Sequence, residues 1–77
     1  MNMTLDEVLR NGKIVAEDEG LGMIVVWNHL NMYTVYDVWD QNNILEVDNF
    51  TCHVRDRVMV QQVAKDYLYD LAEEVAA

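Results

Sequence analysis

The sequence predicts an α+β fold in which a short N-terminal helix, a four-stranded antiparallel meander sheet and a long C-terminal helix follow one another along the chain. Three observations carry this prediction. Between Met23 and Val54 apolar residues recur at strand spacing, polar clusters interrupt them, and from residue 56 onward the apolar spacing changes to three and four. The 77 residues contain no linker or repeat. We therefore expect residues 1–77 to form one domain, a two-layer sandwich with the long helix packed on one sheet face.

The first twelve residues carry signals for both ends of a short helix. Thr4 is a favoured N-cap residue, and Glu7 stands three positions later, as in a capping box. Met3 and Val8 occupy the positions of a hydrophobic staple. Asn11-Gly12 predicts that the helix ends in a left-handed conformation.

Four strands are predicted between this helix and the last segment. Their expected ranges are residues 13–17, 22–28, 32–39 and 44–52, separated by polar turns at 17–20, 28–31 and 40–43. Along the fourth range the apolar residues switch from odd to even sequence positions, so a regular strand would place them on opposite faces. A β-bulge near residues 48–49 would reconcile the two halves.

The last segment, residues 56–75, has the pattern of an amphipathic helix. Asp56 is its expected cap. The apolar stripe consists of Val60, Val63, Ala64, Tyr67, Leu68, Leu71 and Val75.

The middle strands are apolar on both faces, which one long helix cannot cover. In residues 32–39, Tyr33, Val35 and Trp39 oppose Tyr36 and Val38. Either the short N-terminal helix covers the second face, or that face is an exposed interaction surface. In the second alternative the aromatic anchors of a partner contact are Trp27, Tyr33, Tyr36 and Trp39.

The formal net charge of −9, from fourteen acidic and five basic residues, restricts the possible partners. An anionic surface of this density repels nucleic acids and anionic membranes and favours basic protein surfaces. It also promotes solubility without any binding role. The single cysteine, Cys52, excludes an intramolecular disulfide, and the longest apolar run is far too short to span a bilayer. We therefore expect a cytoplasmic protein.

The acidic residues of the C-terminal segment are spaced so that they share one helix face. Asp66, Asp70, Glu73 and Glu74 form this row. A second acidic group, Glu17, Asp18 and Glu19, lies in the first predicted turn. We expect both groups to bind a basic partner in place of nucleic-acid phosphates; the alternative is a solvated helix face.

No catalytic, metal or cofactor signature is apparent in the sequence. Cys52 and His53 are neighbours on a predicted strand, so their side chains point to opposite faces and form no dyad. No His or Cys spacing suits a metal, and Gly20-Leu21-Gly22 lacks the lysine and third glycine of phosphate-binding loops. We expect a protein that is not an enzyme and uses no cofactor or metal.

In overall build the chain resembles the small phage-encoded anti-defence proteins, among them anti-CRISPR and anti-restriction inhibitors. The resemblance rests on short length, acidity, an α+β pattern and the absence of catalytic motifs, and no specific motif carries it. It implies an inhibitor or modulator that binds a basic, nucleic-acid-handling protein. The alternative is a homodimeric structural or regulatory domain whose second sheet face is its own interface.

Overall fold

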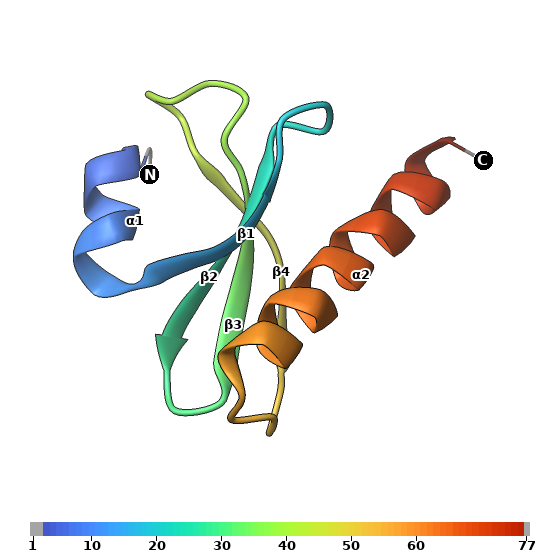
Figure 1. Ribbon diagram of the computed structural model, residues 1–77. Coiled ribbons are helices and arrows are strands. Elements are labelled where there is room, and N and C mark those ends of the chain that lie inside the picture. The colour runs from blue at the N-terminus through green and yellow to red at the C-terminus, as the bar shows by residue number, and fades with distance from the viewer. Residues whose placement is uncertain (1–2, 77) are drawn as a thin grey trace.

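The computed structural model describes residues 3–76 and has the predicted order of elements (Figure 1). The strands form one antiparallel sheet in the order β1-β2-β3-β4, which confirms the α+β meander. No helix within residues 3–76 is long and apolar enough to cross a membrane. The elements are α1 (Leu5–Asn11), β1 (Lys13–Asp18), β2 (Met23–His29), β3 (Met32–Asp37), β4 (Leu45–Thr51) and α2 (Arg57–Ala76).

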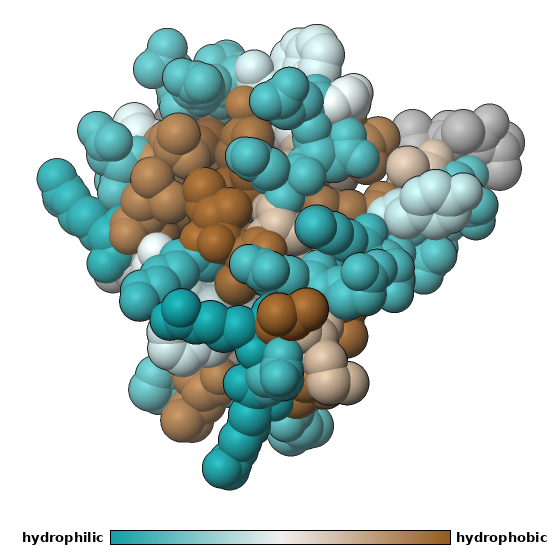
Figure 2. Space-filling view, viewed as in Figure 1, coloured by the Kyte–Doolittle hydropathy of each residue, from teal (hydrophilic) through white to brown (hydrophobic). Residues whose placement is uncertain are grey.

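The two helices lie on opposite faces of the sheet (Figure 1). On one face α2 covers a cluster formed by Ala16, Val25, Tyr33, Val35, Cys52, Val60, Ala64 and Leu68. On the other face α1 covers a smaller cluster of Val8, Ile24, Val26 and Ile44, and apolar side chains gather between α1 and the strands in Figure 2. The expected two layers are thus supplemented by a partial third. Of the two alternatives for the second face, the structure shows cover by the N-terminal helix.

The N-terminal helix begins as predicted but ends differently. The backbone N–H of Glu7 donates to Thr4 Oγ1 at 3.4 Å, which confirms Thr4 as the N-cap. Gly12 is extended (φ −165°), so the expected left-handed ending is wrong. Close packing explains this glycine instead, because a Cβ there would lie 2.3 Å from Val26 Cγ1 and 2.6 Å from the carbonyl oxygen of Trp27.

The structure refines three details of the predicted strands. In the predicted turn at residues 28–31 the residue with positive φ is Leu30 (52°). The β4 bulge falls at Val47, just before the predicted position, because Asp48 pairs with Val35 while Glu46 pairs with Tyr36. Strand β3 ends at Asp37, so Trp39 lies outside it.

Trp39 packs on the β1–β2 turn. A Cβ on Gly22 would lie 2.5 Å from Trp39 Cε3, and Gly22 has a φ of 65°. The backbone N–H of Val38 donates to the carbonyl oxygen of Gly22 at 2.7 Å. Gly22 is therefore required both for the turn and for the approach of the indole ring.

Helix α2 begins where the sequence predicts. Asp56 Oδ1 accepts from the backbone N–H groups of Val58 (2.9 Å) and Met59 (3.2 Å), which confirms the cap. The helix packs chiefly over β1 and less over β2, at the opposite edge of the sheet from β4. A gap between α2 and β4 is therefore left for side chains to bridge.

Candidate protein-interaction site: an acidic groove between α2 and β4

An aromatic stack bridges α2 to the distant edge of the sheet. Tyr33 of β3 stacks on Phe50 of β4 with ring centroids 5.3 Å apart, and Phe50 stacks on Tyr67 of α2 at 4.6 Å. Stacked rings at these separations stabilise the contact beyond the burial of their surface. Tyr67 thus spans the gap between helix and strand.

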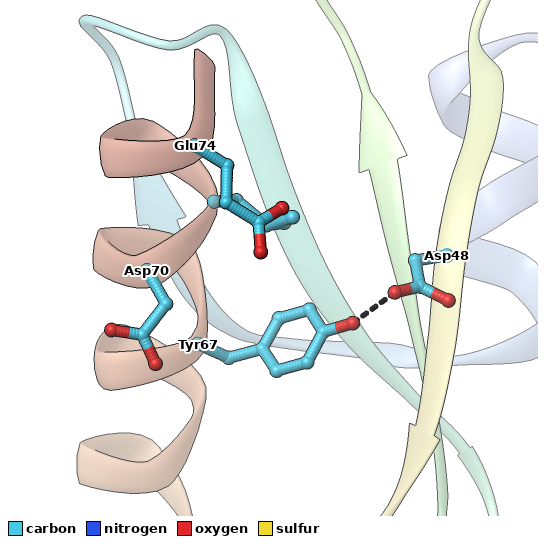
Figure 3. Close-up of a pocket in the computed structure, with 5 residues that line it drawn as sticks. Asp48, Tyr67, Asp70 and Glu74 are labelled. Atoms are coloured by element: carbon cyan, nitrogen blue, oxygen red, sulfur yellow. Dashed lines mark hydrogen bonds between the residues drawn. The ribbon is translucent and has the colours of Figure 1, made fainter. Parts of the chain in front are cut away.

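The hydroxyl group at the far end of the Tyr67 ring donates a hydrogen bond to Asp48 Oδ2 on β4 (Figure 3). This bond to Asp48 raises the pKa of Tyr67 to about 12, with further contributions from burial and from the negative charges of Asp48 and Glu74. The same bond lowers the pKa of Asp48, and the backbone N–H of Asn49, 2.8 Å from Asp48 Oδ1, lowers it further. Asp48 is therefore held as a carboxylate.

A groove of about 230 Å³ opens beside this hydrogen bond, lined by Asp48, Tyr67, Asp70, Leu71 and Glu74. Figure 3 shows Glu74 extending from α2 toward the gap, whereas the carboxylate of Asp70 on the same helix points away from Asp48. Three acidic residues from two elements thus line the groove together with Tyr67 and Leu71, which form its apolar and aromatic floor. Such a groove suits lysine or arginine side chains, because carboxylates accept charge-assisted hydrogen bonds and the floor contacts the aliphatic stems.

Two members of the predicted acidic row lie outside the groove. Asp66 and Glu73 are exposed on α2, and Asp66 Oδ1 accepts from Gln62 Nε2 at 3.0 Å. The structure therefore divides the row, with Asp70 and Glu74 in the groove and the other two on the adjoining helix surface.

The acidic turn forms a separate, smaller feature. Glu17, Asp18 and Glu19 line a hollow of about 70 Å³ with Gly22, Met23, Ile24 and Val38. Asp18 has a structural role there, because its Oδ1 accepts from the backbone N–H of Leu21 at 3.1 Å and holds the turn. Glu17 and Glu19 are exposed and remain candidates for partner contact.

The four aromatic candidates differ in accessibility. Tyr33 is 5% exposed and belongs to the core under α2, so it is not an anchor on an accessible surface. Tyr36 is half-buried beside the α1 cluster. Trp27 is 36% exposed and donates from Nε1 to the carbonyl oxygen of Leu30 at 2.6 Å, whereas Trp39 is 74% exposed.

Sequence reasoning did not identify Asp48 as a site residue. Its carboxylate faces α2 because the bulge at Val47 sets the register of the second half of β4. The change of parity in the sequence was a signal of the bulge but did not fix its position.

The residues with possible nucleophilic or metal chemistry are dispersed. Cys52 is buried under α2, whereas the neighbouring His53 is exposed. Within residues 3–76 no group of three or more His, Cys, Asp and Glu side chains has the geometry to hold a metal ion. No protein-family model, curated protein or solved structure matches this chain.

Proposed function

We propose that this protein is a non-enzymatic inhibitor or modulator that binds a basic surface of a nucleic-acid-handling protein and excludes nucleic acid from it. The observation that carries the proposal is that Asp48, Asp70 and Glu74, from two different elements, line one open groove. The exposed Asp66 and Glu73 extend the same anionic surface along α2. Carboxylates held in this way take the place of backbone phosphates.

The charges of α2 support a binding role because they do not serve the stability of the helix. Its first turn contains no acidic residue and its last turn no basic one, which is the reverse of what the helix dipole favours. Asp66 and Asp70 are like charges four residues apart, and such a pair costs about 0.2–0.5 kcal/mol. A basic target would relieve this repulsion.

Binding would be driven by complementary charge, with a small apolar contribution from Tyr67 and Leu71. The net charge of −9 steers the protein toward a cationic cleft and raises the association rate. Because salt screens such contacts over a Debye length of about 10 Å at 0.1 M, the complex is expected to dissociate at moderate ionic strength. The lone, buried Cys52 suits a reducing compartment, and we place the activity in the cytoplasm.

The homodimeric alternative receives less support. It required the second sheet face as an interface, and α1 packs on that face. The inhibitor proposal therefore stands alone, in keeping with the resemblance to anti-CRISPR and anti-restriction proteins.

The test is affinity capture from a bacterial lysate with three forms of the protein. The wild type is compared with Asp70→Lys combined with Glu74→Lys, which reverses two carboxylates of the groove. The matched control, Asp6→Lys with Glu46→Lys, changes the net charge equally at two exposed positions outside the groove. We expect the wild type and the control to retain a nucleic-acid-binding protein that the groove variant loses.

Salt and competing nucleic acid complete the test. The captured protein should be released between about 0.1 and 0.5 M salt, where the screening length falls below 10 Å, and also by its own nucleic acid. Equal capture by the groove variant, or retention of the partner in the presence of saturating nucleic acid, would contradict the proposal.

A further inference from the structure

The basic residues are concentrated at the end of the molecule opposite the acidic turns. Three connections lie at this end: the one from α1 to β1, the β2–β3 turn and the one from β4 to α2. They carry four of the five basic residues of the chain, Arg10, Lys13, Arg55 and Arg57. We call residues 10–13, 27–32 and 51–59 the cationic end. Asp56, the cap of α2, is its one acidic residue.

Backbone contacts hold these three segments together. Lys13 pairs with Trp27 across β1 and β2, and Met32 pairs with Thr51 across β3 and β4. The backbone N–H of Cys52 donates to the carbonyl oxygen of Asn31 at 2.9 Å. The segments are therefore neighbours: the β2–β3 turn and the β4–α2 connection form the lower end of the molecule in Figure 1, and the α1–β1 junction lies above them on the left.

Apolar side chains protrude from the cationic end. Leu30 is 71% exposed and Met32 56%, both at the β2–β3 turn; Val58 is 74% and Met59 57% exposed, both in the first turn of α2. Figure 2 shows brown and teal side chains interspersed at this end. Exposed apolar side chains among cations are typical of a docking surface.

The other end of the same chain is complementary to this surface. The groove between α2 and β4 presents carboxylates around the apolar floor of Tyr67 and Leu71. The dipole of α2 has the same sense as the side-chain charges, because the helix starts at the cationic end and its last turn contains Glu74. Two copies arranged head to tail would bring opposite charges together, whereas a contact between two cationic ends or between two grooves would bring like charges together.

We propose that the cationic end of one copy docks into the acidic groove of a second copy. The protruding side chains of Leu30, Met32, Val58 and Met59 would contact the floor of the groove, and Arg55 and Arg57 would pair with Asp70 and Glu74. A nucleic acid or an anionic membrane fits less well, because the acidic residues elsewhere on the molecule repel both. The contact is heterologous and leaves one free surface at each end, so association continues beyond a dimer.

The test is sedimentation velocity over a range of protein concentrations at low and moderate salt. The wild type should form concentration-dependent oligomers at low salt and return to monomer at about 0.5 M, where charges are screened within a few ångströms. Arg55→Glu with Arg57→Glu should abolish association, and so should Asp70→Lys with Glu74→Lys. Lys65→Glu, at an exposed position in the middle of α2, is the control and should associate like the wild type.

Mixing the two monomeric variants is the decisive step. Glutamates on the cationic end of one variant then face lysines in the groove of the other, while the intact groove of the first faces the intact cationic end of the second, so the mixture should regain association as alternating oligomers. Neither variant alone should associate. A wild type that stays monomeric at low salt, or variants that associate unchanged, would overturn the inference.

Two further measurements separate this inference from other readings. Binding of a monomeric wild type to phosphatidylserine vesicles, lost in the Arg55→Glu, Arg57→Glu variant, would assign the cationic end to membranes and overturn head-to-tail docking. At protein concentrations below those at which the wild type associates, target capture by the same variant is expected to equal that of the wild type, because its groove is intact. Failure of the proposed function and failure of this inference are therefore distinguishable.

Discussion

At the scale of single residues, the hydrogen bond between Tyr67 and Asp48 fixes the shape of the groove and gives it a titration signature. It favours protonated Tyr67 and ionised Asp48, raising the pKa of the first to about 12 and lowering that of the second. The contribution of Asp48 to stability is therefore present at neutral pH and lost as the pH falls through its lowered pKa. The contribution of Tyr67 is full below about pH 10 and lost as the pH rises through about 12.

Asp48→Asn tests this coupling directly. Removing the carboxylate removes the first cause of the shift, so the pKa of Tyr67 should move from about 12 toward its ordinary value of 10.0. An NMR titration that follows the Tyr67 ring resonances measures the change. Asp40→Asn, in an exposed loop outside the groove, should leave the titration as it is in the wild type.

Gly12 provides a second prediction at the residue scale. A methyl group at this position meets Val26 Cγ1 at 2.3 Å and a backbone oxygen at 2.6 Å, neither of which moves easily in a packed strand. Gly12→Ala should lower the free energy of unfolding by about 1–3 kcal/mol through overpacking, as measured by urea denaturation. Gly20→Ala is the matched control, because a Cβ there would come no closer than 3.3 Å to a neighbouring atom, Asp18 Oδ1, and its effect should stay within about 0.5 kcal/mol. Equal losses would contradict this packing account of Gly12.

At the scale of the elements, α2 is a helix whose charges oppose its own stability. Glu73 lies in the last part of the helix, three residues from Asp70. Glu73→Lys should therefore stabilise the protein by about 0.3–1 kcal/mol through the helix dipole and relief of like-charge repulsion. It should also weaken capture of a basic target. Thermal unfolding at low salt together with the capture assay checks both, and Glu73→Gln should show a smaller change in the same direction.

The elements also show how far the sequence determines the structure. The helices, the four strands and the caps at Thr4 and Asp56 follow from local spacing and local hydrogen-bonding groups, so they were predictable. The packing role of Gly12 was not predictable, because it depends on the close approach of β2 to this residue. Asp48 was missed for a related reason: which way it faces depends on the pairing between β3 and β4. The groove is thus a tertiary feature, although Asp70 and Glu74 were identified from helix spacing alone.

At the scale of the whole molecule, the sheet separates two hydrophobic clusters of unequal size. The one under α2 contains Leu68, Val25 and Val35 among its most buried side chains, whereas α1 contributes Val8 as its one buried residue among those described. A short helix held by so few contacts opens locally before the sheet unfolds. Amides of α1 should therefore exchange hydrogen through a low-energy opening, and those in the middle of β2 and β3 only through global unfolding.

Native-state hydrogen exchange at increasing urea measures this difference. Leu68→Ala should reduce global stability by about 2–5 kcal/mol and accelerate exchange throughout the sheet. Val8→Ala should act first on the amides of α1. A common exchange free energy for α1 and the central strands would show that the two clusters unfold together instead.

The free edge of β4 adds a constraint at the same scale. Its exposed positions include the bulge at Val47 and the acidic residues Glu46 and Asp48. A bulge and like charges both discourage pairing with the β4 edge of another molecule. Association of copies through the ends of the molecule is therefore compatible with a sheet that does not extend from one molecule to the next.

The placement of the two tryptophans has a practical consequence. Trp27 of β2 lies opposite Lys13 of β1 in the sheet. The backbone N–H of Trp39 donates a hydrogen bond to the carboxylate of Asp37, and Asp40 follows Trp39 in the sequence. Each indole is thus an intrinsic fluorophore in an electrostatic environment of opposite sign. Iodide, an anion, should therefore quench the fluorescence of Trp27 more strongly, and caesium, a cation, that of Trp39. Quenching measured on two single-tryptophan variants would report separately on the surroundings of each tryptophan.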